Sequence, residues 1–178
     1  MRRPTMFLAV LGLALTLGAG TARAVEQHCA AGVQCEGTDE DDTLKGDAGA
    51  NTVYGFGGAD TITGGDGDDV LLHGDARPDG ALDGADKVSG GAGNDYLTGA
   101  GRADVLLGGP GNDLILAEEG AENGRPGGRD TVKGGDGQDI IEAVDGFKDV
   151  IDCGRGRDKV RYDRGIDTVE NCEEKTPR

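Results

Sequence analysis

Aromatic and nucleophilic side chains are scarce in this sequence. Phe and Tyr make up 3% of the chain and Trp is absent, which excludes a large aromatic core. Beyond residue 24 the only serine is Ser89, and the only histidines are His28 and His73. Neither a His-Glu-x-x-His zinc motif nor a Gly-x-Ser-x-Gly nucleophile elbow occurs. We therefore expect a protein that is not an enzyme.

One histidine does have acidic neighbours. His73 precedes Asp75 and Asp79, an arrangement that a general acid–base pair could use. A solvated histidine in a loop is the simpler interpretation. A glycosidase would need a sugar-binding cleft with two separated carboxyl groups, and nothing in the sequence builds such a cleft.

Positive charge is in deficit. The chain has 18 Lys and Arg against 34 Asp and Glu, which gives a net charge of −16 at pH 7. A surface of this sign repels nucleic acid, so we expect no nucleic-acid partner. The charge also opposes folding unless cations neutralise it.

Long apolar runs are absent except at the N-terminus. Met6–Ala19 is apolar, Arg2 and Arg3 precede it, and Ala22-Arg23-Ala24 forms a small-residue cleavage pattern. Residues 1–24 therefore predict a signal peptide, and a retained membrane anchor is the alternative. Cleavage would give a secreted, extracellular chain that starts at Val25 and has no transmembrane segment. The arginine pair leaves export by the Sec or the twin-arginine route open.

Glycine, by contrast, is abundant and periodic. Residues 90–116 contain one nine-residue pattern three times: a glycine-rich turn, an Asp at position six and an aliphatic residue at position eight. A short fixed period is typical of a solenoid, in which each unit buries its apolar face only against its neighbours. Two units would form one eighteen-residue turn with two short parallel strands, one in each of two sheets.

The pattern continues from Gly37 to Glu170, in thirteen units. Two eight-residue segments, His73–Gly80 and Ala117–Gly124, fit no unit, and we interpret them as loops. Position six is Asp42, Asn51, Asp60, Asp69, Asp86, Asp95, Asp104, Asp113, Asp130, Asp139, Asp149, Asp158 and Asp167. Position eight is Leu44, Val53, Ile62, Leu71, Val88, Leu97, Leu106, Ile115, Val132, Ile141, Ile151, Val160 and Val169.

The stacked position-six carboxylates indicate a metal ion. They repel one another along both edges of the solenoid unless cations lie between them. Ligands that are all oxygen select a hard cation, so we expect several calcium ions.

The two edges are not equivalent. With the two loops set aside, the complete Gly-Gly-x-Gly-x-Asp units are the fourth, sixth, eighth and tenth, which begin at Gly64, Gly90, Gly108 and Gly134. All four fall on one edge, here called the even edge, and the other is the odd edge. We expect the even edge to hold the better calcium sites.

Basic residues gather in the last units. They could replace calcium by pairing with the Asp residues, or they could only increase solubility, and the sequence leaves both open. They are Lys148, Arg155, Arg157, Lys159, Arg161 and Arg164.

The four cysteines predict disulfides in an exported protein. Proximity favours Cys29–Cys35 and Cys153–Cys172 among three connectivities. The first would make residues 25–36 an N-terminal cap. The second would close a C-terminal cap with the tail 171–178.

The nonapeptide resembles the calcium-binding repeat of the RTX (repeats-in-toxin, hemolysin-type) family. The resemblance covers residues 37–170 and implies an all-β, right-handed parallel β-roll with calcium between loops one turn apart. The implied ligands are turn carbonyls and the position-six side chains. The best sites lie between the turns at Gly64, Gly90, Gly108 and Gly134, with Asp69, Asp95, Asp113 and Asp139 as side-chain ligands. Asp42, Asn51, Asp60, Asp86, Asp104, Asp130 and Asp158 are further candidates.

Together these features predict a secreted calcium-binding β-roll that folds on calcium. Two alternatives remain. The first is an extracellular adhesin or matrix-interaction module that uses the two loops for contact. The second is an accessory module that binds a polysaccharide or an enzyme.

Overall fold

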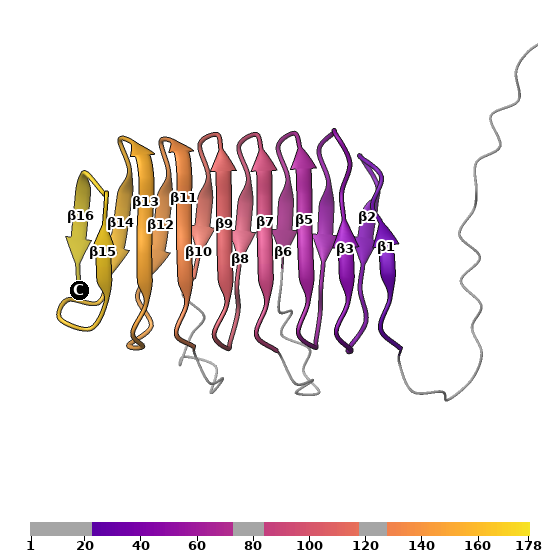
Figure 1. Cartoon of the computed structure of the whole chain (residues 1–178), viewed down its shortest axis with the longest axis horizontal. Helices are drawn as coiled ribbons and strands as arrows, with labels where there is room; N and C mark the ends of the chain where they lie inside the picture. Colours follow the sequence, from indigo (N-terminus) through magenta and orange to yellow (C-terminus); the bar gives the residue numbers. More distant parts are fainter. Residues whose placement is uncertain (1–22, 73–83, 118–127) are drawn as a thin grey trace, which may run out of the picture.

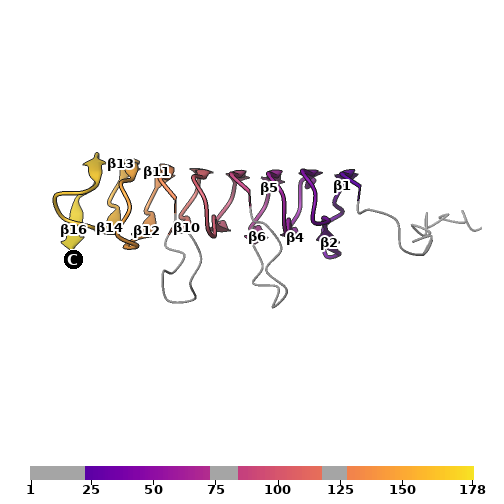
Figure 2. The same ribbon diagram turned by 90° about the horizontal axis from the view of Figure 1, so that it is seen from below.

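The computed structural model describes residues 23–72, 84–117 and 128–178. Two parallel sheets face each other, and the strands of each follow one another along one common axis (Figures 1 and 2). One sheet has the order β1-β3-β5-β7-β9-β11-β13-β15, and the other has the order β16-β14-β12-β10-β8-β6-β4-β2. The chain therefore alternates between the sheets with every strand, as expected for a parallel β-roll.

The strands are short. The first sheet contains β1 (Glu26–His28), β3 (Thr43–Lys45), β5 (Thr61–Asp66), β7 (Lys87–Ala92), β9 (Val105–Pro110), β11 (Thr131–Gly137), β13 (Val150–Gly156) and β15 (Thr168–Glu170). The second contains β2 (Gln34–Glu36), β4 (Thr52–Tyr54), β6 (Val70–Leu72), β8 (Tyr96–Thr98), β10 (Leu114–Leu116), β12 (Ile140–Ala143), β14 (Lys159–Tyr162) and β16 (Glu174–Pro177).

Each predicted unit forms one strand, from β3 to β15. Position eight points between the sheets, and eleven of its thirteen side chains are 0% exposed, from Leu44 to Ile151. Val160 is 1% exposed, and Val169 packs against the core from its border. The core is thus a single column of aliphatic side chains, which confirms the expected β-roll.

The register shows how the roll continues across the two interruptions. Position-six residues that face each other are 18 or 19 residues apart where no interruption intervenes and 26 apart where one does. Both interruptions fall between a strand of the second sheet and one of the first, on the odd edge. His73–Gly80 and all of Ala117–Gly124 except Ala117 lie outside the described residues. Ala117 itself is buried, and its N–H donates to the Glu142 carbonyl at 2.8 Å, so it still belongs to the roll.

Three strands lie outside the predicted repeats. β1 and β2 form a complete first turn from residues 26–36 by pairing with β3 and β4. β16 pairs with β14 and extends the second sheet at the C-terminal end. These segments lack the Gly and Asp pattern. Cys35 nevertheless occupies the position-eight register, opposite Val53, and is buried.

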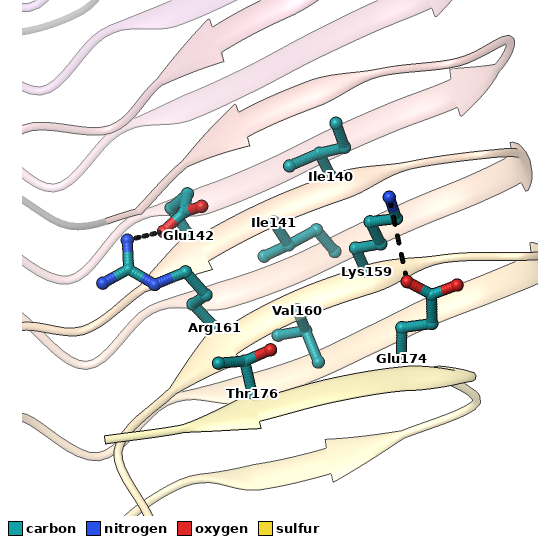
Figure 3. A pocket seen from close by; sticks show the side chains of 8 residues that line it. All are labelled: Ile140, Ile141, Glu142, Lys159, Val160, Arg161, Glu174 and Thr176. Carbon is teal, nitrogen blue, oxygen red and sulfur yellow. Dashed lines mark hydrogen bonds and ion pairs between the residues drawn. The ribbon is translucent and has the colours of Figure 1, made fainter.

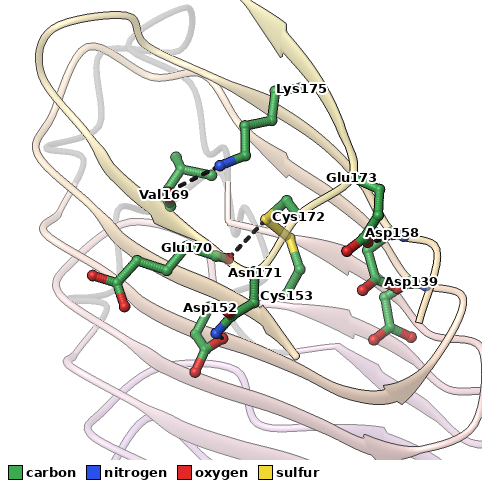
Figure 4. The surroundings of a disulfide bond; sticks show 10 residues. All are labelled: Asp139, Asp152, Cys153, Asp158, Val169, Glu170, Asn171, Cys172, Glu173 and Lys175. Carbon is green, nitrogen blue, oxygen red and sulfur yellow. Dashed lines mark hydrogen bonds between the residues drawn. A yellow bond between two sulfur atoms is a disulfide. The ribbon is translucent and has the colours of Figure 1, made fainter. Parts of the chain in front are cut away.

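Both predicted disulfides form. The Cα atoms of Cys29 and Cys35 are 5.5 Å apart, and those of Cys153 and Cys172 are 5.1 Å apart. All four side chains belong to the buried core at the two ends of the roll, and Figure 4 shows the C-terminal pair. Each disulfide therefore covers one end of the aliphatic column.

The two disulfides should differ in their effect on stability. The chain-entropy account gives about 3 kcal/mol for the Cys153–Cys172 loop and about 2 kcal/mol for the shorter Cys29–Cys35 loop. We therefore expect Cys153→Ser with Cys172→Ser to lower the thermal midpoint of the calcium-loaded chain more than Cys29→Ser with Cys35→Ser. Thermal melts followed by circular dichroism measure this. A larger effect at the N-terminal end would contradict it.

No helix in the part of the chain that the structure describes is long and apolar enough to cross a membrane.

Candidate metal centre

The position-six side chains form two ladders, one along each edge. In each ladder, Oδ1 of a position-six Asp accepts a hydrogen bond from the backbone N–H of the position-six residue one turn earlier. The eleven bonds of this kind span 2.7–3.0 Å. Glu173 continues the even-edge ladder beyond Asp158 by accepting from the Asp158 N–H at 3.0 Å (Figure 4). One oxygen of each ladder carboxylate is thus used to hold adjacent turns together.

The second oxygen of the even-edge carboxylates has no protein partner. The Oδ2 atoms of Asp69, Asp95, Asp113, Asp139 and Asp158 are buried without a hydrogen bond. The side chains themselves are 0–2% exposed. Leaving an ionised oxygen buried and unpartnered is costly, so this row calls for a ligand that the polypeptide does not supply.

Electrostatics agrees with this conclusion. Burial raises the pKa of Asp69 to about 6, that of Asp113 to about 7 and that of Asp139 to about 6. The pKa values of Asp95 and Asp158 are also raised, mainly by burial. Neighbouring carboxylates add to the rise, and the ladder hydrogen bonds partly oppose it. Without a cation, the folded roll therefore disfavours the ionised form of these groups.

Glycine at position one places no Cβ beside the free oxygens of Asp69, Asp95, Asp113 and Asp139. The ideal Cβ position on Gly64 lies within 2.5 Å of both Asp69 Oδ2 and the carbonyl oxygen of Gly90 in the next turn. The Cβ position on Gly108 likewise lies beside Asp113 Oδ2 and the Gly134 carbonyl oxygen. That on Gly134 lies beside Asp139 Oδ2 and the Cys153 carbonyl oxygen. We call this space the position-one gap. It brings a carboxylate and a carbonyl oxygen together, which is the donor set that calcium prefers.

The even-edge turns are also the more regular ones. The strands that enter them run for six or seven residues from β5 to β13, so pairing continues into the turn. Gly91 and Gly93 have φ values of 116° and 140°, and a Cβ at either would collide with a carbonyl of the preceding turn. On the odd edge, Phe56 and Ala100 adopt positive φ without being glycine, which is strained. The even edge thus keeps the regular glycine-rich turn of the repeat.

Comparison with known families identifies the repeat. The family model described as RTX calcium-binding nonapeptide repeat matches four times, at residues 36–71, 81–101, 98–122 and 127–147. The chain belongs to this family. None of the curated proteins compared with it matches. The predicted resemblance is therefore confirmed, and the ladders are those of an RTX calcium-binding roll.

The first two repeat units of the RTX roll, which contain Asp42 and Asn51, differ from the others. Asp42 accepts hydrogen bonds from Thr38 and Val25 with both of its oxygens, so protein groups already satisfy it. Asn51 accepts from the Asp47 N–H at 3.0 Å, and its amide donates to the Cys29 carbonyl at 3.3 Å. A neutral amide here supplies a donor where the later even-edge turns present a free oxygen.

The remaining predicted RTX residues lie in the ladders. Asp60, Asp86, Asp104 and Asp130 are buried on the odd edge at 2–4% exposure, each in hydrogen-bond register with the next turn. The candidate glycines Gly64, Gly90, Gly108 and Gly134 open the even-edge turns, and a Cβ at each would clash with the Oδ2 atom of its own unit's Asp.

Sequence reasoning missed two acidic residues. Asp145 occupies position two of its unit, where the complete units have glycine, and the structure groups it with Asp130 and Asp149 on the odd edge. Glu173 follows the last unit and serves as the final ladder acceptor. An acid at an unusual repeat position was the available signal for Asp145. Only the stacking of β16 on β14 reveals the role of Glu173.

The basic residues of the last units pair on the surface. Arg161 contacts Glu142 at 2.6 Å, and Arg157 contacts Glu174 at 2.7 Å (Figure 3 shows the former). Lys159 lies 3.7 Å from Glu174, and Arg155 lies 3.8 Å from Asp136. Among the described residues, the ion pairs of these four bases therefore go to acids outside the ladders, and the five even-edge carboxylates keep their free oxygens.

A shallow pocket lies on the outer face of the second sheet, over β12, β14 and β16 (Figure 3). Its volume is about 160 Å³, below the size of typical small-molecule sites. Its charged side chains are engaged in the Arg161–Glu142 and Lys159–Glu174 pairs. This pocket offers no set of groups poised for catalysis, and the family comparison identifies a calcium-binding repeat domain only.

Proposed function

We propose that this protein is a secreted calcium-binding β-roll that folds on calcium and carries out no catalysis of its own. The row of buried, unpartnered Oδ2 atoms along the even edge is the observation that supports it. A folded chain with these atoms ionised requires cations at regular spacing. Calcium matches their all-oxygen surroundings and the family's repeat.

The calcium ions would lie between successive even-edge turns. Asp69, Asp95, Asp113 and Asp139 would each contribute the free oxygen, and the position-one carbonyl of the next turn would contribute a second. Asp158 is the next member of the row, but Cys153 replaces the glycine at position one of its unit. Asp60, Asp86 and Asp104 on the odd edge would form a weaker set.

Secretion is consistent with the disulfides at both ends of the roll, because such bonds persist in oxidising compartments. Removal of the proposed signal peptide 1–24, which contains three arginines and no acid, would change the net charge from −16 to −19. Adhesion or polysaccharide binding through the two loops stays a prediction, because the loops lie almost wholly outside the described residues.

Paired substitutions on the two edges test the calcium assignment. We expect Asp113→Asn to lower calcium affinity at its site by on the order of tenfold or more, as loss of a charged metal ligand does. Asn keeps the Oδ1 ladder acceptor, so the change isolates the free oxygen. Asp104→Asn is the matched odd-edge control. Its turn departs from the repeat, because Ala100 and Arg102 replace glycine at positions two and four.

The calcium midpoint of folding, followed by circular dichroism, measures both variants. A larger shift for Asp113→Asn supports the even-edge assignment, and equal shifts would contradict it. A wild-type chain with no response to calcium would contradict the proposed function itself.

A further inference from the structure

We propose that Asp130, Asp145 and Asp149 form an additional calcium site on the odd edge, built by three carboxylates rather than by the glycine-rich turn. This inference rests on the proposed calcium function. It concerns the turn that opens at Val144, which the repeat pattern does not predict to bind metal.

That turn has lost most of the features of the repeat. Val144 replaces glycine at position one, Asp145 replaces it at position two and Phe147 replaces it at position four. Without a glycine at position one, the gap found on the even edge is not available here. A site at this turn therefore needs a different set of ligands.

The structure provides such a set. One carboxylate oxygen from each of Asp130, Asp145 and Asp149 lies within 4.8 Å of the other two. Calcium binds oxygen at roughly 2.3–2.6 Å, so oxygens at this separation can share one ion. Asp130 and Asp149 come from successive turns, and Asp145 reaches the same space from position two.

Two of these carboxylates have an oxygen that the protein leaves unpartnered. Asp149 is 0% exposed, and its Oδ2 is buried without a hydrogen bond. Asp145 Oδ2 is also buried without one. The other oxygens are in use: Asp149 Oδ1 accepts from the Asp130 N–H at 2.9 Å, and Asp145 Oδ1 accepts from the Phe147 N–H at 2.7 Å. The two residues with an unpartnered oxygen, Asp145 and Asp149, thus both belong to the three-carboxylate cluster.

The acids around the cluster cannot neutralise its negative charge. Asp163 Oδ2 accepts from the N–H groups of Asp145 and Gly146, and Asp167 accepts from those of Asp149 and Asp163. Both only add negative charge. In the described ranges 23–72, 84–117 and 128–178, none of the recorded ion pairs involves these acids.

A cation from solution therefore completes the cluster. The absence of His and Cys from it disfavours zinc and copper, and three carboxylates suit a hard ion such as calcium. Three carboxylates also exceed the two position-six carboxylates of adjacent even-edge turns. Since affinity rises with ligand charge, we expect this site to be among the tightest of the roll.

The decisive experiment counts bound ions. Calcium binding to the mature chain is measured by equilibrium dialysis and calorimetry for wild type, Asp145→Asn and the control Glu26→Gln. Asn keeps the acceptor for the Phe147 N–H, and Glu26 is an exposed acid on β1, outside the calcium-binding turns. We expect Asp145→Asn to bind one ion fewer, or to weaken one tight step by about tenfold. Glu26→Gln should match wild type.

An unchanged ion count and unchanged affinities in Asp145→Asn would overturn the inference while leaving even-edge binding intact. Absence of calcium binding in wild type would instead overturn the proposed function. If Asp145→Asn does not fold, crystals of the wild-type chain grown with terbium decide the matter. An anomalous peak between Asp130, Asp145 and Asp149 supports the site, and a map with peaks only on the even edge refutes it.

Discussion

Removal of calcium at neutral pH is expected to unfold the roll. Five even-edge carboxylates have a buried oxygen without a partner, and they stack one turn above another. The core that opposes their repulsion is a single column of aliphatic side chains. We therefore expect a chelator to remove most of the β-sheet signal in circular dichroism.

The size of this effect follows from mass action. A ligand present at a hundred times its dissociation constant stabilises the folded state by roughly 2.7 kcal/mol per site. Several such sites together match the 5–15 kcal/mol that typically separates a folded domain from its unfolded chain. Magnesium is the control, because it requires a tighter octahedral geometry and gives up its water reluctantly. Full β-structure in the chelated protein would refute coupled folding.

Acid should partly replace calcium. Burial raises the folded-state pKa of Asp113, Asp130 and Asp149 to about 7, and that of Asp69 and Asp139 to about 6, from an ordinary value of 3.8. Between these values the folded chain holds more protons than the unfolded chain, so stability falls as pH rises. The stabilisation by protons is complete below about pH 4 and is lost as pH rises through 6 to 7.

Two measurements test this sign. The calcium-free chain should gain β-sheet signal when pH is lowered from 8 towards 4.5, and lose it again on return to pH 8. The calcium midpoint of folding should also move, to lower concentration at pH 5.5 than at pH 8, because bound protons already supply part of the stabilisation. The calcium affinity of the chain that is already folded should instead weaken at pH 5.5, because protons compete for the same oxygens. A calcium-free chain that is most structured at pH 8 would show that the carboxylates are ionised without cost.

Most of the fold could be predicted from the nine-residue period of the sequence. An aliphatic residue at position eight and an Asp at position six are determined by local stacking, so the sequence alone placed thirteen strands and both ladders correctly. The pairing of β1 with β3 and of β16 with β14 depends on contacts with the finished roll, and residues 26–36 and 174–177 carry no repeat of their own.

The candidate site was predictable only where the period holds. The position of Asp69 or Asp113 follows from the unit, whereas the grouping of Asp145 with Asp130 and Asp149 depends on how two odd-edge turns stack. The ladder hydrogen bonds were not predicted either. They show that each Asp has two tasks, since one oxygen joins adjacent turns and the other faces the proposed ion.

The way the sheets terminate limits how copies of this protein can associate. The sheet ends are formed by β1 and β2 at one end and by β15 and β16 at the other, and three of these strands have only three residues. The fourth, β16, contains Pro177, which has no N–H to donate to an added strand. Short, charged or proline-containing border strands discourage strand addition. The regular backbone of the roll could template a fibre. Because its border strands discourage strand addition, we expect the protein to remain a discrete particle of fixed length.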